Sequence, residues 1–149
     1  MTSPRRLLTF SSIRAICEDK NDDTEVRLIY ANRSEEDILM RSALDRFEKQ
    51  SGGQFRAHYL VDKPSAGWKG GVGFCTKQTM QDHLPAVSGG KCGSSSRSRY
   101  WICAKSLLDT KVFLCGPPGM VNASKSNLIE LGFEAPGAVS KISDQVFCF

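Results

Sequence analysis

Two stretches, 26–31 (VRLIYA), which is apolar with β-branched residues, and 55–61 (FRAHYLV), lie on either side of one amphipathic segment. Such stretches predict strands of a parallel sheet that is covered on both faces. Between them, Ser34 is expected to open a helix with acidic residues in its first turn, and Gly52 and Gly53 are expected to end it. The apolar side of this helix carries Met40, Leu44 and Phe47. A strand, a crossover helix and a second strand together predict an α/β fold.

Further segments continue the alternation of strands and helices, so the expected architecture is an open, mostly parallel sheet with flanking helices. The glycine-rich residues 67–74 are expected to form a mobile connection. The other expected elements are a short strand at 7–10, a helix capped by Ser11 or Ser12 that ends at Asp19, a loop at 62–65, a short helix that ends at Leu84, a strand at 112–114, a helix at 121–131 and a terminal strand at 144–149.

One interval, residues 86–109, does not fit this alternation. It combines three glycines with a run of serine and arginine at 94–99, a composition that is typical of a linker. A loop of this length is unusual inside a compact domain. We therefore expect residues 86–109 to be a disordered insert within a domain that spans residues 13–149.

Composition excludes several classes of protein. Six cysteines are scattered along the chain without a Cys-x-x-Cys pair or a histidine pair at metal spacing. This pattern argues against a disulfide framework or a metal site and favours a reducing compartment. The formal net charge of +4 is spread along the chain and does not indicate a nucleic-acid partner. No apolar run is long enough to cross a bilayer, so no membrane attachment is expected from this sequence.

The strand expected at 112–114 runs directly into Cys115-Gly-Pro-Pro-Gly-Met120. Two prolines cannot continue a ladder of hydrogen bonds, and two glycines allow a tight turn or a close approach to a ligand. This stretch resembles the Cys-Gly-Pro-Pro-x-Met element of ferredoxin-reductase-like flavoenzymes, specifically the NADH half of NADH–cytochrome b5 reductases. Other pieces that resemble the family, in its fungal microsomal form, are RAIC at 14–17, LIYANRSEEDIL at 28–39, VDKP at 61–64, GF at 73–74 and DQVFCF at 144–149.

The resemblance implies a ferredoxin-reductase-type, Rossmann-like domain that binds NADH. Within it, Cys115 would be the catalytic residue beside the nicotinamide, a position that suits a small thiol without a fixed charge. Without the resemblance, Cys115 would be regarded as an ordinary buried cysteine at the end of a strand. The residues that would shape the same pocket are Gly116, Pro117, Pro118, Gly119 and Met120.

The adenosine end of the dinucleotide would be bound near the ends of the first two predicted strands. Asp62 resembles the family's acidic residue at the adenosine ribose, where a carboxylate accepts hydrogen bonds from free hydroxyls and repels the 2′-phosphate of NADPH. On chemistry alone, Asp62 is as well explained as an exposed loop residue, and an arginine at position 33 is suited to pair with a 2′-phosphate. The resemblance assigns to the same region Ala31, Asn32, Arg33 and Phe74, of which Phe74 is by default a core phenylalanine.

In the family, a hydride passes from NADH to FAD, and single electrons then pass to cytochrome b5 or a similar haem protein. Members of the family lie on the cytoplasmic side of the endoplasmic reticulum or of the mitochondrial outer membrane. The resemblance therefore implies an oxidoreductase with NADH and FAD as cofactors and a haem protein as partner.

Two features of the family have no counterpart in this sequence. The family's first central strand leads into a glycine-rich loop that cradles the pyrophosphate, whereas residues 1–12 contain no glycine. The flavin motif Arg-x-Tyr-[Thr/Ser] does not occur in the 149 residues. We therefore expect a non-family N-terminus at 1–12, a lacking or replaced first strand, no FAD bound by this chain, and impaired activity of the chain by itself.

Two other functions stay open. A non-catalytic α/β domain that is a relic of a nucleotide-binding protein, or that mediates protein contacts, would have the same strands and helices. Nitrate reductases share the same NADH module and are the nearest alternative within the superfamily. Binding of NADH and of NADPH distinguishes the non-catalytic alternative from the others.

Overall fold

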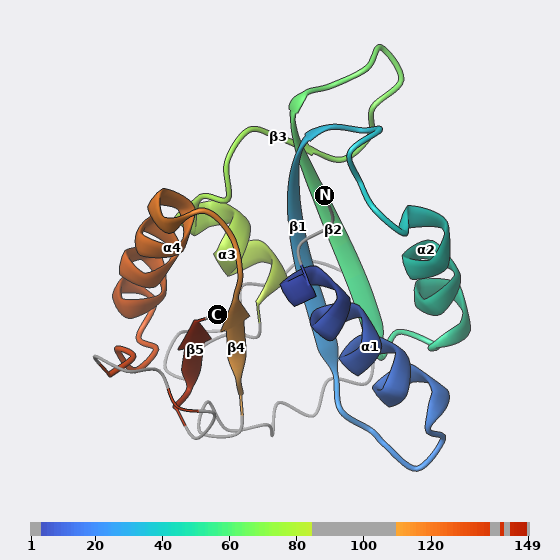
Figure 1. The fold of residues 1–149 in the computed structure, drawn as a ribbon, viewed down its shortest axis with the longest axis horizontal. Helices are drawn as coiled ribbons and strands as arrows, with labels where there is room; N and C mark the ends of the chain where they lie inside the picture. Colours follow the sequence, from blue (N-terminus) through green and yellow to red (C-terminus); the bar gives the residue numbers. More distant parts are fainter. Residues whose placement is uncertain (1–3, 85–109, 138–140, 142–143, 149) are drawn as a thin grey trace, which may run out of the picture. The chain divides into compact units, whose positions relative to one another are not determined.

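The computed structural model describes residues 4–84, 110–137, 141 and 144–148, in two compact units formed by residues 1–76 and 77–149. Figure 1 labels the elements of both units. The first unit contains α1 (Pro4–Glu18), β1 (Val26–Ser34), α2 (Arg41–Gln50), β2 (Phe55–Lys63) and β3 (Gly71–Val72). The second unit contains α3 (Lys77–His83), β4 (Val112–Leu114), α4 (Pro118–Glu130) and β5 (Val146–Cys148).

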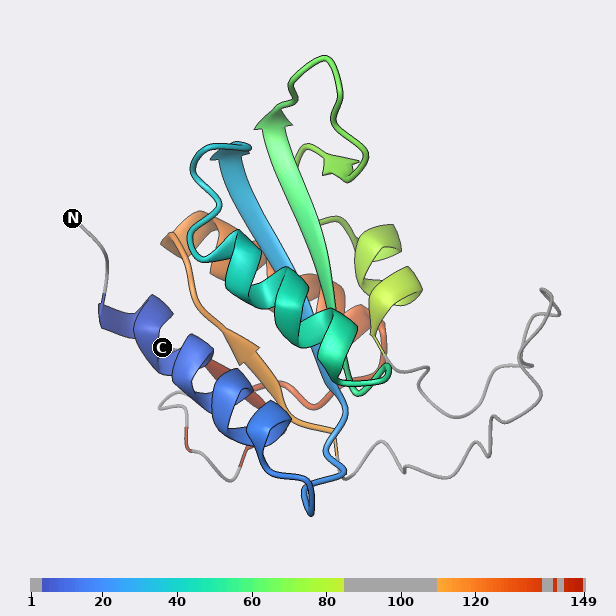
Figure 2. The same cartoon turned by 90° about the vertical axis from the view of Figure 1, so that its right-hand side faces the viewer.

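The sheet of the first unit has the strand order β1-β2-β3 and is parallel throughout. Strands β1 and β2 are in register from the pair Val26 and Phe55 to the pair Ser34 and Lys63, so the two strands end side by side. Helix α2 connects them and crosses one face of the sheet (Figure 2). The predicted α/β fold with a parallel sheet and a crossover helix is therefore confirmed.

The core of the first unit lies between the sheet and helices α1 and α2. Phe55, at the start of β2, is fully buried and clusters with Ile13 of α1 and with Leu44 and Phe47 of α2. The predicted apolar side of α2 is confirmed for these two residues, but Met40 is 45% exposed. Met40 precedes the first turn in a left-handed conformation, with a φ of 57°, and therefore leaves the helical spacing.

The expected strand at 7–10 is wrong, because these residues belong to helix α1. Ser11 and Ser12 lie inside this helix and do not cap it. The apolar side chains that pack against the core are separated by three and four residues, which is the spacing of one side of a helix. They are Phe10, Ile13 and Cys17.

The start expected for α2 at Ser34 is also wrong. Ser34 is the last residue of β1, and both its hydroxyl and its backbone amide donate to Asp37 Oδ2, at 2.7 and 3.1 Å. These bonds stabilise a turn after the strand. Serine and aspartate favour such turns, because their side chains bond to nearby backbone groups in place of a helix. The helix begins only at Arg41.

The connection expected to be mobile at 67–74 contains strand β3, which pairs with Leu60 and Val61 of β2. The Trp68 indole nitrogen donates to the Gly71 carbonyl at 2.9 Å, and the Gly73 amide donates to the Val61 carbonyl at 2.9 Å. Hydrogen bonds to β2 and within the segment therefore fix the path of the connection, which was expected to be mobile. The loop expected at 62–65 begins two residues later, since β2 extends through Lys63.

In the second unit, β4 and β5 pair in parallel, which confirms the expected strands at 112–114 and near the end of the chain. Helix α4 begins at Pro118 and not at position 121, because a proline lacks only an amide hydrogen that the first turn leaves unpaired. The helix ends at Glu130 and is followed by a left-handed Gly132, after which the Phe133 amide donates to the Leu128 carbonyl at 3.0 Å. Leu128, Phe133 and Val146 are buried in this unit.

The insert expected at 86–109 lies outside the described residues. Among the residues that the structure does describe, no helix has the length and the apolar character that crossing a membrane requires.

Candidate functional site

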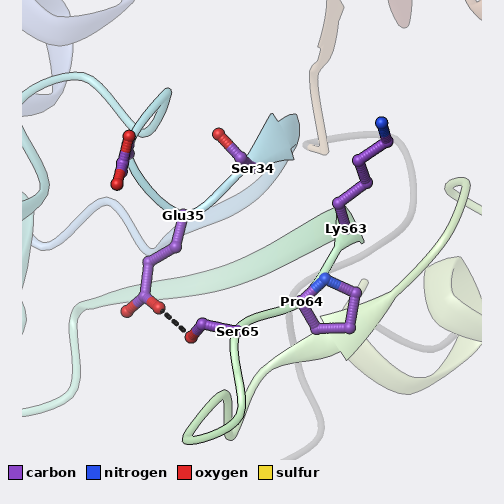
Figure 3. Close-up of a pocket in the computed structure, with 6 residues that line it drawn as sticks. Ser34, Glu35, Lys63, Pro64 and Ser65 are labelled. Carbon is purple, nitrogen blue, oxygen red and sulfur yellow. Dashed lines mark hydrogen bonds between the residues drawn. The ribbon is translucent and has the colours of Figure 1, made fainter.

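A pocket of about 390 Å³ lies where β1 and β2 end (Figure 3). Parallel strands present their carboxyl ends at the same edge, which is where open α/β sheets bind ligands. The first unit places there the last residue of each strand and the loops that follow. The residues that line the pocket are Ser34, Glu35, Glu36, Lys63, Pro64 and Ser65.

Glu35 is the most constrained side chain of this pocket. One of its carboxylate oxygens, Oε2, accepts a hydrogen bond from Ser65 Oγ at 2.7 Å (Figure 3), and the other, Oε1, pairs with the Arg41 guanidinium. These interactions, of which the Ser65 hydrogen bond has the largest effect, lower the pKa of Glu35 from its ordinary value. Glu35 is therefore held as an oriented carboxylate, able to accept hydrogen bonds from a ligand rich in hydroxyls.

The predicted adenosine residues lie beside this pocket and do not line it. Ala31 and Asn32 are in the last part of β1, next to Leu60 and Val61 of β2. Arg33 and Asp62 are exposed, each one residue before the strand ends. Since side chains alternate between the faces of a strand, both point to the opposite face from the pocket residues Ser34 and Lys63.

Two further observations concern this edge of the sheet. The Asn32 amide nitrogen is buried and has no hydrogen-bond partner among the described residues. A buried donor of this kind is rare and calls for an explanation such as a ligand or an ordered water.

Phe74, two residues after β3, is 77% exposed, so the default interpretation of Phe74 as a core phenylalanine is wrong.

The residues predicted at the nicotinamide lie in the second unit, in the turn from β4 to α4. Cys115 is half-buried directly after β4, and Gly116 and Pro117 are exposed before the helix begins. Pro118 and Gly119 form the first turn of α4, followed by the half-buried Met120. A side chain at position 116 would collide with the end of the Met120 side chain, so glycine there permits Met120 to cover the turn.

Sequence reasoning did not single out Glu35, Ser65, Arg41 or Trp68. The sequence pattern predicts that Glu35 lies in the first turn of a helix. Its position shortly after the strand predicted at 26–31 is the signal that could have identified it as a site residue. Nothing in the local sequence indicated that Ser65 and Arg41 would meet this carboxylate, because Ser65 lies in the connection after β2 and Arg41 is the first residue of α2.

Replacing Glu35 with glutamine is expected to change how stability depends on pH. Because the pKa of Glu35 is lowered in the folded chain from 4.5, its interactions stabilise the fold above this value and are lost as the pH falls through the folded pKa. The difference in melting temperature between wild type and Glu35→Gln should therefore be largest above the ordinary pKa of a glutamate and narrow as the pH falls below it. Glu36→Gln, which changes the exposed neighbouring carboxylate, is the control. Parallel curves for wild type and Glu35→Gln would contradict the prediction.

The comparison with protein families matches residues 9–126 to the oxidoreductase NAD-binding domain. The chain is 36% identical over 140 residues to NADH-cytochrome b5 reductase 1 of Cryptococcus neoformans var. neoformans serotype D, which covers 94% of this chain and 44% of that protein. It is 43% identical over 129 residues to NADH-cytochrome b5 reductase 1 of Ajellomyces capsulatus, covering 87% of this chain and 35% of that protein. The chain thus spans less than half of the length of these relatives.

Among solved structures, the chain is similar to the cytochrome b5 reductase domain of Ulva prolifera nitrate reductase. The TM-score is 0.71 and the sequence identity is 31%, and the match covers 95% of this chain and 44% of that one. In all three matches, nearly the whole of this chain corresponds to less than half of the other protein.

Proposed function

Because the chain belongs to the family of oxidoreductase NAD-binding domains and is similar over nearly its whole length to part of the cytochrome b5 reductases, we propose that it binds NADH. The adenosine portion is assigned to the carboxyl ends of β1 and β2, where Arg33, Asp62 and the pocket residues lie. The nicotinamide portion is assigned to the turn from Cys115 to Met120. Bound NADH would supply a hydride for a flavin, from which electrons would pass to a haem protein such as cytochrome b5.

The observation that carries the proposal is the pocket at the ends of β1 and β2. It combines an oriented carboxylate, Glu35, with the hydroxyls of Ser34 and Ser65 and the ammonium of Lys63. A ribose offers hydroxyls to the carboxylate, and a phosphate suits an ammonium. The buried and unpaired Asn32 amide at the same edge supplies one more donor for a polar ligand. The residues that are present therefore fit the adenosine part of a dinucleotide.

At the other assigned end, Cys115 is proposed to contact the nicotinamide and orient it, while Gly116 lets the backbone approach closely. A thiol fills space there without a fixed charge beside the hydride path. Because the flavin motif does not occur in the 149 residues, the flavin is proposed to be held by polypeptide outside them. The chain tested by itself is accordingly proposed to bind nucleotide without rapid turnover.

Asp62 lies at the same edge as the pocket but on the other face of the sheet from Lys63, and it is proposed to select NADH by repelling the 2′-phosphate of NADPH where the ribose crosses the end of β2. Calorimetry on the purified chain should show tighter binding of NADH than of NADPH. In Asp62→Ser, which keeps a hydrogen-bonding side chain without the charge, affinity for NADPH is expected to rise about tenfold, equivalent to about 1.4 kcal/mol.

The matched control is Asp23→Ser, which removes an exposed aspartate three residues before the start of β1, whereas Asp62 lies near the carboxyl end of β2. Equal changes in NADPH affinity for the two variants would contradict the role of Asp62. A wild-type chain that releases no heat with either nucleotide would contradict the proposed function and favour a domain that only mediates protein contacts.

A further inference from the structure

Arg41, the first residue of α2, is the centre of a cluster that joins two connections of the first unit to strand β2 and helix α2. Its guanidinium pairs with Glu35 and lies 3.9 Å from Asp45 Oδ2. The same group lies over two aromatic rings, 5.3 Å from the centroid of Trp68 and 5.8 Å from that of Tyr59. A planar cation between aromatic faces and carboxylates is an arrangement that arginine forms and lysine does not.

The partners of Arg41 belong to both loops that line the pocket. Glu35 lies in the connection from β1 to α2, and Trp68 lies in the connection from β2 to β3. The two loops also meet directly, because Ser65 Oγ donates to Glu35 Oε2 at 2.7 Å. The Trp68 amide donates to the Ser65 carbonyl at 3.1 Å, so the position of the indole and that of Ser65 are coupled.

Other bonds fix the partners of Arg41 in turn. The Trp68 indole nitrogen donates to the Gly71 carbonyl at 2.9 Å, which ties the loop to β3. The Tyr59 hydroxyl donates to Asp45 Oδ1 at 2.9 Å, which ties β2 to α2. Burial and the hydrogen bond to Asp45 raise the pKa of Tyr59, so this hydroxyl keeps its proton. The groups that contact Arg41 are therefore themselves fixed by hydrogen bonds to the sheet and to helix α2.

This arrangement affects the pocket more than it affects the stability of the whole unit. The side chains of Arg41 and Glu35 are 39% and 34% exposed, and ion pairs with this exposure contribute little to the stability of a fold. Their effect on geometry is larger, because a loop without such contacts samples many conformations before a ligand binds. A pocket whose loops are already in place does not lose this freedom on binding.

We propose that Arg41 is a positioning residue, which preforms the pocket for the adenosine portion of an adenine dinucleotide by holding Glu35 and the Trp68 loop together. The inference rests on the proposed function, since the ligand is the one assigned to this edge of the sheet. Arg41 itself does not line the pocket and acts through Glu35, Ser65 and Trp68.

The test uses the full chain with Trp101→Phe, which leaves Trp68 as the only tryptophan of the two in the sequence. Acrylamide quenching of Trp68 without ligand reports the position of the loop, and calorimetry with ADP-ribose reports the pocket. In Arg41→Met we expect stronger quenching and about tenfold weaker binding of ADP-ribose. Arg41→Lys keeps the charge but not the planar fork and should fall between wild type and Arg41→Met.

The matched control is Arg46→Met, because Arg46 lies on the same helix with its guanidinium 5.7 Å from the Phe47 ring, and it does not line the pocket. This variant should leave both measurements unchanged. Ser65→Ala, which removes one hydroxyl, should weaken the binding of ADP-ribose less than Arg41→Met does. This variant keeps the test valid if Arg41→Met does not fold.

The outcomes separate this inference from the proposed function. Weaker binding without a change in quenching would mean that Arg41 contacts the ligand itself, which overturns a positioning role. Unchanged binding in Arg41→Met, with wild type binding ADP-ribose, overturns the inference alone. Failure of wild type to bind ADP-ribose overturns the proposed function and, with it, the assigned ligand.

Discussion

Replacing Phe55 with alanine is expected to lower the free energy of unfolding of the first unit by about 3–5 kcal/mol. Phe55 has an exposed fraction of 0% and contacts the cluster formed by Ile13, Leu44 and Phe47. Its removal leaves a cavity among side chains from α1 and α2 that the surrounding backbone fills only in part. Because small domains are stable by only about 5–15 kcal/mol, this loss removes a substantial part of the stability of the fold.

Urea unfolding followed by circular dichroism measures the loss. The control is Phe74→Ala, since Phe74 is 77% exposed and its truncation should change stability by no more than about 0.5 kcal/mol. If the two variants were equally stable, α1 and α2 would not share a core with β2. That result would contradict the arrangement of the first unit.

Replacing Gly70 with alanine is expected to cost about 1–3 kcal/mol and to displace the Trp68 loop. A Cβ atom at position 70 would lie 2.8 Å from a carbon of the Trp68 indole and 2.8 Å from the Tyr59 carbonyl oxygen. The carbonyl belongs to β2 and cannot move without disturbing the sheet. The indole must therefore shift away from Gly71 and Arg41, and we expect binding of NADH to weaken with it.

Gly67→Ala is a matched control within the same loop, because a Cβ atom there has no neighbour within 4 Å. Alanine at this position should leave stability unchanged or raise it by about 0.4–1 kcal/mol, since it restricts the unfolded chain. Melting temperature and the emission of Trp68 in the Trp101→Phe background measure both effects. Equal melting temperatures for the two variants would show that the space next to Gly70 is open.

Local patterns were sufficient for the order and type of the main elements. Strands and helices that pack on a core bury side chains at regular intervals along the chain. This regularity is visible in the apolar stretches of β1 and β2 and in the spacing of Leu44 and Phe47 between them. The comparisons confirm the family and the α/β fold class that these patterns and the Cys-Gly-Pro-Pro-Gly-Met stretch indicated. The roles of Cys115, Asp62 and the other site residues stay predictions, and so do the extent of the domain and the insert.

Patterns failed where one segment satisfied two local rules. Ser34 followed by acidic residues is a good helix start, and it is also a good turn after a strand, which is what the structure contains. The segment at 7–10 is apolar enough for a strand, but Ile13 and Cys17 continue its spacing as a helix that packs against Phe47 and Phe55. At Ser34 the hydrogen bonds to Asp37 favoured the turn, and at 7–10 packing against the core favoured the helix.

The amino-acid sequence alone thus specified a parallel strand–helix–strand unit and its lineage, because hydrophobic spacing and turn chemistry act over a few residues. Tertiary structure decided which side chains form the pocket. Glu35, Arg41 and Trp68 meet only because β1 and β2 are in register and two separate loops return to the same edge of the sheet. Contacts of this kind depend on how distant segments are placed in space, which no local spacing encodes.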